Sequence, residues 1–191
     1  NKGISFEDIY EQIIRKSLYR VGTLWEQNKL SVAEEHMATS VAETVMNALF
    51  EHLISPERKA LKALVGCVED EQHQVGAKMV ADVFESRGWD SFFPGAGIPV
   101  SELIRFGLQV KPDVLALSVS ISFHLNALEN MIRQIRENMP DLPVWVGGQA
   151  FRLTGTDMLK KYSRVTYIRD LYALEEMIDT FCLDINQSVL S

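Results

Sequence analysis

From residue 60 onward, short apolar runs alternate with segments of helical character, and this alternation limits the folds open to the chain. We expect strands at about Leu61–Val68, Ser91–Phe93, Val114–Ser118, Val144–Val146 and Val165–Tyr167. Between and after them we expect helices at about Gly76–Arg87, Val100–Gly107, Leu125–Asn138, Asp157–Lys161 and Leu171–Phe181. Strands that alternate with helices are typical of a parallel sheet covered on both faces. The sequence therefore predicts an α/β fold with five parallel strands.

The first part of the chain has helical periodicity instead. Ser5 with Asp8, and Ser31 with Glu34, match the helix-capping pattern ahead of periodic apolar runs. The two runs place an apolar stripe on each helix: Ile14, Leu18, Val21 and Trp25, then Met37, Val41, Val45, Leu49 and Leu53. We expect an antiparallel helix pair within residues 1–57, a linker at "SPERK", and the α/β domain over residues 58–191.

Charge and composition exclude several classes of protein. The net charge of -7 argues against a surface that binds nucleic acid non-specifically. No apolar run is long enough for a membrane helix, and no signal-peptide pattern opens the chain, so we expect a cytoplasmic location and no membrane partner. Cys67 and Cys182 lie in apolar stretches and are expected to be buried free thiols. The sequence begins at Asn1 rather than Met, which leaves a longer polypeptide open.

Polar residues and glycines follow three of the expected strands. Parallel sheets bind ligands in the crevice at the carboxyl ends of their strands, so these positions are candidates for one site. A glutamate near a histidine can accept its ring N–H, which fixes the tautomer and raises the basicity of the other nitrogen toward a metal. Glycine lets a bulky group approach the backbone. The candidates are Glu71, His73 and Gly76 after the first strand, Ser118 and Ser120 after the third, and Gly147 and Gly148 after the fourth.

Each of these signals alone is weak. A loop histidine is most often structural or solvated, and a Gly-Gly pair is usually a turn. A dinucleotide site is disfavoured because no G-x-G-x-x-G follows the first strand. The four histidines and two cysteines show no zinc-ligand spacing, and no G-x-S-x-G motif is present.

These candidates follow a fixed order along the chain: E-x-H-x-x-G, then a serine after the third strand, then Gly-Gly after the fourth. This order resembles that of the cobalamin (B12) binding domain of methionine synthase, methylmalonyl-CoA mutase and corrinoid proteins. The pattern of those proteins is usually D-x-H-x-x-G, S-x-L and GG, so Glu71 replaces an aspartate and Ser120 a leucine. The resemblance implies a Rossmann-like (flavodoxin-like) domain with His73 as the lower axial cobalt ligand. It also implies a slot for the displaced dimethylbenzimidazole, lined by Ser118, Ser120, Gly147 and Gly148.

The helical part strengthens this resemblance. Trp25 is followed after nine residues by Glu35 and His36. This W-x9-E-H pattern resembles the helical cap of the adenosylcobalamin photoreceptors that regulate carotenoid genes. In that family the three residues lie over the upper face of the cofactor and enclose the adenosyl group. The alternative is that Trp25 only continues its apolar stripe and that Glu35 and His36 form a solvated helix turn.

Two departures limit what the resemblance implies. Glu26 stands where the photoreceptors carry the histidine that captures cobalt after light expels the adenosyl group, so that photoproduct is not expected. The MerR-type DNA-binding domain and the first half of the four-helix cap are not found in this sequence, so direct DNA binding is not expected. A lone helix pair buries its stripes poorly. We therefore expect partner helices, from a second copy in a homo-oligomer or from a preceding segment.

Three functions remain open for the sequence, and none requires an enzyme, because no acid/base pair built for turnover is visible. The first is a sensory module that holds adenosylcobalamin and responds to light or to cofactor supply. The second is a corrinoid protein of a methyltransferase system, with methylcobalamin as the working form and a partner enzyme on each side. The third keeps the fold but places haem or bilin in the site, since His73 suits iron as well as cobalt. A domain that only binds other proteins would leave the three groups of loop residues unexplained.

Overall fold

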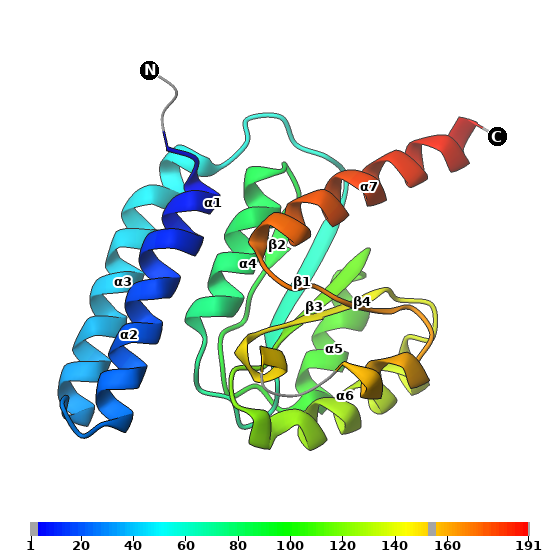
Figure 1. Cartoon of the computed structure of the whole chain (residues 1–191). Coiled ribbons are helices and arrows are strands. Elements are labelled where there is room, and N and C mark those ends of the chain that lie inside the picture. Colours follow the sequence, from blue (N-terminus) through cyan, green and yellow to red (C-terminus); the bar gives the residue numbers. More distant parts are fainter. Residues whose placement is uncertain (1–3, 153–155, 191) are drawn as a thin grey trace. The chain divides into compact units, whose positions relative to one another are not determined.

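The computed structural model describes residues 4–152 and 156–190, with the side chains of residues 4–152 and 156–185. It divides into two compact units, Asn1–Ile54 and Ser55–Ser191. The first unit is helical, and the second contains a sheet with helices (Figure 1). No helix among the described residues is long and apolar enough to cross a membrane.

The first unit is a pair of helical segments. The first segment runs through α1 (Phe6–Asp8), the π-helix η1 (Ile9–Ile14) and α2 (Arg15–Glu26), and the second is α3 (Val32–Leu53). Both predicted caps are present: the Asp8 N–H donates to Ser5 Oγ at 3.1 Å, and Ser31 and Glu34 form a reciprocal capping box. The π-helix was not predicted, because its wider turn leaves no distinct spacing in a run of six residues.

The predicted apolar stripe of α3 lies largely on the surface. Met37 is 68% exposed, Val41 60% and Val45 43%, whereas Met46, next to this stripe, is fully buried. The face of α3 that packs against α2 is therefore a different one from the stripe that the spacing of four residues picks out. The first unit consequently carries an apolar strip along α3.

The second unit is built on a five-stranded parallel sheet, as predicted. Its strands stand in the order β2-β1-β3-β4-β5, and every neighbouring pair is parallel. This is the doubly wound order in which the chain reverses direction between β1 and β3. The strands are β1 (Lys62–Cys67), β2 (Asp90–Phe92), β3 (Val114–Ser118), β4 (Val144–Gly147) and β5 (Val165–Tyr167).

Helices cover both faces of this sheet (Figure 1). On one side α4 (Val75–Ser86) packs against α7 (Leu171–Leu190), and on the other α5 (Val100–Val110) packs against α6 (Leu125–Asn138). Short 3-10 helices follow β3 and β4: η2 (Ser122–His124), η3 (Gln149–Arg152) and η4 (Asp157–Lys161). The predicted helix at Asp157–Lys161 is therefore a 3-10 helix, and α7 is longer than the predicted Leu171–Phe181.

Two apolar clusters hold the layers together. The α5/α6 side buries aliphatic side chains from the helices and from alternate positions of the strands, among them Leu64, Leu103, Leu117, Ile132 and Val146. The α4/α7 side is aromatic: Phe84 lies 5.2 Å from Trp89 and 5.8 Å from Trp145, measured between ring centroids, and Phe181 contacts both tryptophans. Burial of this apolar surface on both faces stabilises a sheet without a solvent-facing side.

The two cysteines are free thiols, but only one is buried. Cys67 lies at the end of β1 and is 4% exposed; burial, with the charge of Glu71 nearby, raises the pKa of its thiol to about 12. Cys182 is partly exposed on α7, where its sulfur accepts a hydrogen bond from Lys59 Nζ at 3.5 Å. The expectation that Cys182 is buried was wrong: its neighbour Leu183 is also exposed, at 61%, so this part of α7 is not covered on all sides.

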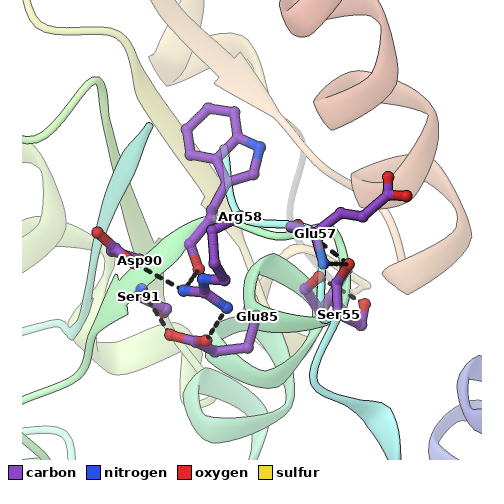
Figure 2. A network of polar contacts seen from close by, with 9 residues as sticks. Ser55, Glu57, Arg58, Glu85, Asp90 and Ser91 are labelled. Carbon is purple, nitrogen blue, oxygen red and sulfur yellow. Dashed lines mark hydrogen bonds and ion pairs between the residues drawn. The ribbon is translucent and has the colours of Figure 1, made fainter. Parts of the chain in front are cut away.

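The linker predicted at "SPERK" is fastened to the second unit by Arg58 (Figure 2). The guanidinium of Arg58 donates to Glu85 Oε2 at 2.8 Å, to the Trp89 carbonyl at 2.6 Å and to Asp90 Oδ1 at 2.7 Å. Glu85 in turn accepts the backbone N–H of Ser91 through its other carboxylate oxygen at 2.8 Å. The linker is thus bound to the end of α4 and the start of β2.

Backbone contacts hold the same segment. The Ser55 N–H donates to the Glu85 carbonyl at 3.2 Å, and the Lys59 N–H donates to the Gly88 carbonyl at 2.6 Å. A side chain at Gly88 would overlap the carbonyl oxygen of Glu57, and Gly88 also adopts a φ of +80°. Both the lack of space and the backbone conformation therefore require glycine at this position. The linker therefore belongs structurally to the second unit.

We expect Arg58→Leu to lower the free energy of unfolding of the second unit by about 1–2 kcal/mol, because it removes three charge-assisted hydrogen bonds that are partly exposed to water. Urea unfolding followed by the fluorescence of the buried Trp89 and Trp145 measures this loss. The control is Arg105→Leu, whose pairing with Glu102 is exposed (78% for Arg105) and should cost under about 0.5 kcal/mol. Equal losses in the two variants would contradict a fastening role for Arg58.

Candidate functional site

The predicted residues of the second unit gather where β1 and β3 end side by side. Cys67 at the end of β1 pairs with Ser118 at the end of β3, and Ser118 pairs with Gly147 at the end of β4. The Val68 N–H donates to the Ser118 carbonyl, and the Val119 N–H donates to the Gly147 carbonyl, each at 3.0 Å. Three loops therefore leave the sheet together at the switch point where folds of this order bind ligands.

Glu71 is the centre of this edge. Its side chain is fully buried, and both of its carboxylate oxygens accept hydrogen bonds. Oε1 accepts the backbone N–H of His73 at 3.0 Å and also contacts the His73 ring nitrogen Nδ1. Oε2 accepts the backbone N–H groups of Ser120 at 2.9 Å and Ile121 at 3.1 Å, and His124 Nδ1 lies 3.3 Å away. One carboxylate thus joins the loops after β1 and β3.

These donors keep Glu71 ionised. Burial by itself raises the pKa of a carboxyl group. The hydrogen bonds from the His73 ring, from the His73 N–H and from the Ser120 N–H outweigh it and lower the pKa of Glu71 to about 2. At neutral pH Glu71 is therefore an anion that only accepts hydrogen bonds, and a histidine nitrogen bonded to it must carry the proton.

His73 is held at one ring nitrogen, while most of its side chain faces solvent. Its Nδ1 is bonded to Glu71, and 58% of its side chain is exposed. The bond to an ionised carboxylate places the proton on Nδ1 and leaves Nε2 as the basic nitrogen of the ring. This is the arrangement that a histidine needs to act as a neutral metal ligand through Nε2.

Gly76 lies one residue into α4 and faces Ser118. A Cβ built on Gly76 would lie 3.6 Å from Ser118 Oγ, which is an ordinary van der Waals distance. Ser118 itself is buried at the end of β3. The protein alone therefore does not require glycine at this position, and the room beside Gly76 is available to another group.

Gly147 and Gly148 are required by the protein's own backbone. Gly148 has a φ of +119°, and a side chain there would overlap the carbonyl group of Val119. A Cβ on Gly147 would lie 2.9 Å from the Ile168 carbonyl oxygen. Gly148 thus lets the loop after β4 lie directly against the loop after β3, and Gly147 lets the end of β4 lie against the residue that follows β5, whatever else the two glycines line.

The predicted residues of the first unit lie at one end of the helix pair. Trp25 is half-exposed in the last turn of α2, and Glu35 and His36 lie in the first turns of α3, which packs against α2. Glu35 Oε1 accepts a hydrogen bond from Thr39 Oγ1 at 3.0 Å, and Glu35 Oε2 lies 3.8 Å from His36 Nε2. The helix pair therefore brings an exposed indole ring and a polar pair to the same end.

Sequence reasoning missed His124. The sequence analysis gave this histidine no role, yet its ring lies 3.3 Å from the carboxylate that holds His73. A signal was present: His124 follows β3, whose end meets the end of β1 at the same edge of the sheet. His52, the other histidine left unassigned, lies in the last turn of α3 and is exposed.

Known proteins match both parts of the chain. A family model described as a B12 binding domain matches residues 61–176, and a second model with the same description matches residues 1–50. The chain is 28% identical over 144 residues to the HTH-type transcriptional repressor CarH of Myxococcus xanthus, a match that covers 75% of this chain and 48% of the repressor. The chain thus spans about half the length of that relative.

Corrinoid proteins match a similar share of this chain. Dimethylamine corrinoid protein 3 of Methanosarcina acetivorans is 26% identical over 145 residues, which cover 74% of this chain and 68% of that protein. The solved structure of the Methanosarcina barkeri monomethylamine corrinoid protein has a TM-score of 0.77 over 92% of this chain and 84% of the other, at 13% sequence identity. This last likeness shows a shared fold.

The different surroundings of Gly148 and Gly76 predict effects of very different size for the same change. We expect Gly148→Ala to destabilise the second unit by about 2–4 kcal/mol, because alanine is strained at that φ and would overlap Val119. Gly76→Ala should change stability by less than about 1 kcal/mol, since its Cβ meets only an ordinary contact within a helix. Urea unfolding of the two variants measures both values. A Gly148→Ala protein as stable as Gly76→Ala would contradict the close packing of the loops after β3 and β4.

Proposed function

The chain belongs to the B12-binding domain family, and we propose that it is a sensory or regulatory module that holds adenosylcobalamin with His73 as lower axial ligand. It responds to light or to cofactor supply by a change in the packing or assembly of its helical cap. The curated relatives are named as a repressor and as corrinoid proteins, which supports a cobalamin-binding regulator or carrier rather than a catalyst. The family also favours cobalamin over haem or bilin.

The pairing of His73 with buried Glu71 is the observation that carries this proposal. A corrin macrocycle supplies its own equatorial nitrogens, so the protein needs to add one basic nitrogen from below. His73 has that nitrogen, a fixed tautomer and a largely exposed ring. The room beside Gly76 and Ser118 lies on the same edge of the sheet, where Ser120, Gly147 and Gly148 border the adjoining loops. The residues present therefore fit a corrinoid whose lower ligand is replaced by histidine.

The first unit favours adenosylcobalamin among the corrinoids. Bound adenosylcobalamin supplies a cobalt–carbon bond that light can break. We assign to Trp25, Glu35 and His36 the enclosure of the adenosyl group, because the helix pair holds an indole face and a polar pair at one end. An exposed tryptophan can stack on an adenine ring, and carboxylate and imidazole groups can hydrogen-bond ribose and base. On this proposal the first unit is the cap, half of a four-helix bundle.

Glu26 determines which state the site can reach once the upper ligand is lost. It ends α2 directly after Trp25 and is exposed. A carboxylate at this position cannot reproduce the bis-histidine state that the resembling photoreceptors form. With Glu26 at this position, His73 would be the residue that holds cobalt, and Trp25, Glu35 and His36 would change their packing if the adenosyl group no longer contacted them.

A second copy of the chain is the partner we propose for the cap. The strip formed by Met37, Val41 and Val45 is apolar, regularly spaced and exposed, as in the seam of a helix bundle that packs against further helices. Two helix pairs together supply the four helices of a bundle. A chain that elutes as a monomer both in darkness and after illumination would contradict this assembly.

A methyl carrier is the second candidate, because the match to the dimethylamine corrinoid protein covers most of both chains. In that case the corrinoid carries a methyl group on cobalt, methylcobalamin is the working form, and the partners are methyltransferases. A carrier must uncover the upper face of its cofactor and needs no enclosure for an adenosyl group. The two functions therefore differ in whether Trp25, Glu35 and His36 enclose an adenosyl group.

Absorption spectra after addition of adenosylcobalamin in darkness, and again after green illumination, test the main proposal. We expect a bound corrinoid with a histidine-ligated spectrum in darkness, and a spectral change with a shift in size-exclusion elution after light. His73→Ala should remove the histidine-ligated spectrum, whereas His52→Ala, an exposed histidine of α3, should retain it. No bound corrinoid would end the proposal, and an unchanged spectrum in His73→Ala would overturn the ligand assignment.

Trp25→Ala distinguishes sensor from carrier. We expect about tenfold weaker binding of adenosylcobalamin, since stacking of an aromatic ring on a base contributes about 1–3 kcal/mol. Binding of methylcobalamin should stay within about twofold. Isothermal titration of both corrinoids measures the ratio, with Ile13→Ala as an exposed apolar control in the same unit. Equal weakening for both corrinoids, or none for either, would favour the methyl carrier.

A further inference from the structure

We propose that the apolar strip of α3 packs against the same strip of a second copy, with the two α3 helices antiparallel and Val41 near the twofold axis. In this arrangement Met37 of one copy faces Val45 of the other. The inference rests on the proposed function in one respect, namely that a second copy is the partner of the cap. It adds the contact surface, the orientation of the two copies and their register.

The exposed face of α3 is uncharged over most of its length. Met37, Val41 and Val45 are 68%, 60% and 43% exposed, and Thr44 and Ala48 are exposed on the same side of the helix. Residues three, four and seven positions apart lie on one side of a helix, so these five side chains form one continuous surface. A surface of this kind on a helix pair marks a site of contact with another protein.

The hydroxyl groups along this face are already bonded within the helix. Thr44 Oγ1 donates to the Ser40 carbonyl at 2.8 Å, and Ser40 Oγ, at the edge of the strip, donates to the His36 carbonyl at 3.0 Å. A hydroxyl that is buried without a partner costs about 1–3 kcal/mol. Neither of these hydroxyls would lose a partner when the face is covered, so the face is suited to burial.

The charges of the first unit favour a second copy as the protein that covers the strip. α3 contains no lysine or arginine, and α2 carries cations near its start, Arg15, Lys16 and Arg20. The acidic residues of α3 are Glu34, Glu35, Glu43 and Glu51. Because α2 lies beside α3 in each copy (Figure 1), a copy that packs on the strip also brings its α2 cations toward the acidic margins of α3. Opposite charges around an apolar contact help to select the partner.

The same charges determine the orientation of the pair. In a parallel pair each glutamate of α3 would lie level with its counterpart, and the two helix dipoles would point the same way, which is unfavourable. In an antiparallel pair centred on Val41, Glu34 lies level with Ala48 of the partner and Glu43 lies level with Thr39 of the partner. The other two glutamates also lie level with uncharged residues. The antiparallel register therefore separates all the carboxylates of α3.

This register connects the contact between the copies to the cofactor end of each cap. Glu35 and His36 lie level with residues 47 and 46 of the partner. The two copies of His36 are about 15 Å apart along the axis, from a rise of about 1.5 Å per residue, so each copy encloses its own adenosyl group. A change in packing at Glu35 and His36 then alters the contact with the partner's α3.

Single cysteines on α3 of the full chain test the orientation. The background is Cys182→Ser, because Cys182 is partly exposed, whereas Cys67 stays in place, since it is buried and the pKa of its thiol is raised to about 12. Val41→Cys should form a disulfide between copies under mild oxidation. Met37→Cys should not crosslink with itself, because the two positions are about 12 Å apart along the axis and a disulfide joins Cα atoms about 4.4–6.8 Å apart.

A mixture of two variants completes this test. Met37→Cys combined before oxidation with a tagged Val45→Cys protein should give a crosslinked heterodimer. Asn47→Cys, exposed on α3 but outside the strip, is the control and should not crosslink. Non-reducing electrophoresis measures each product, without cofactor and again with adenosylcobalamin in darkness. Self-crosslinking of Met37→Cys as strong as that of Val41→Cys, or crosslinking of Val41→Cys no stronger than that of Asn47→Cys, would overturn the inference.

Val41→Glu tests the contact itself by analytical ultracentrifugation under the same two conditions. We expect at least about tenfold weaker association, because the change places an unpaired carboxylate of each copy at the axis. Asn47→Glu should associate within about twofold of the parent, and far-UV circular dichroism checks that both variants are folded. A parent that stays monomeric in both conditions, or parent-like association of Val41→Glu, would overturn the inference. If the parent takes up no adenosylcobalamin, the cofactor part of the proposed function fails, while the measurements without cofactor still decide the contact.

Discussion

The buried carboxylate of Glu71 depends on an arrangement that no local sequence can supply. An ionised group without solvent contact is stable only when its oxygens are well hydrogen-bonded. Its donors come from the residues next to it and from a segment about 50 residues further along the chain. That segment is within reach only because β1 and β3 are neighbours and Cys67 pairs with Ser118 at their ends. The orientation of His73 thus depends on the ionised state of Glu71, and that ionised state depends on the order of the strands.

The elements that could be predicted are those whose signal is contained in a short stretch of chain. β3 and β5 were predicted at their observed bounds, and both caps of the first unit were found, because apolar runs and capping residues act locally. The approach of Ser120 and Ile121 to Glu71 could not be foreseen in the same way. Their backbone N–H groups are the donors, and every residue other than proline has one. A contact made by a backbone group does not depend on the side chain, so the residue type does not predict it.

Glycine occurs at positions 148 and 76 for two different physical reasons. A Cβ at Gly148 would overlap the loop after β3, so the fold itself demands glycine there. A Cβ at Gly76 would meet only an ordinary contact with Ser118 Oγ, so the fold does not. Sequence reasoning assigned both to the approach of a ligand. The structure gives Gly148 an explanation within the protein and leaves Gly76 as the position at which room for another group is the simpler reason.

The linker limits how a change in the cap could reach the second unit. Its proline and charges end the helical period, as the sequence indicated, but the partners of Arg58 lie 27 to 32 residues away and were not predictable from the linker. Because Ser55 and Lys59 are also bonded through their backbones to the end of α4 and the turn after it, the segment is not a flexible tether. α3 ends at Leu53, so Ile54 alone separates it from the fastened segment. The linker is thus part of the folded second unit from Ser55 onward, two residues after the end of α3.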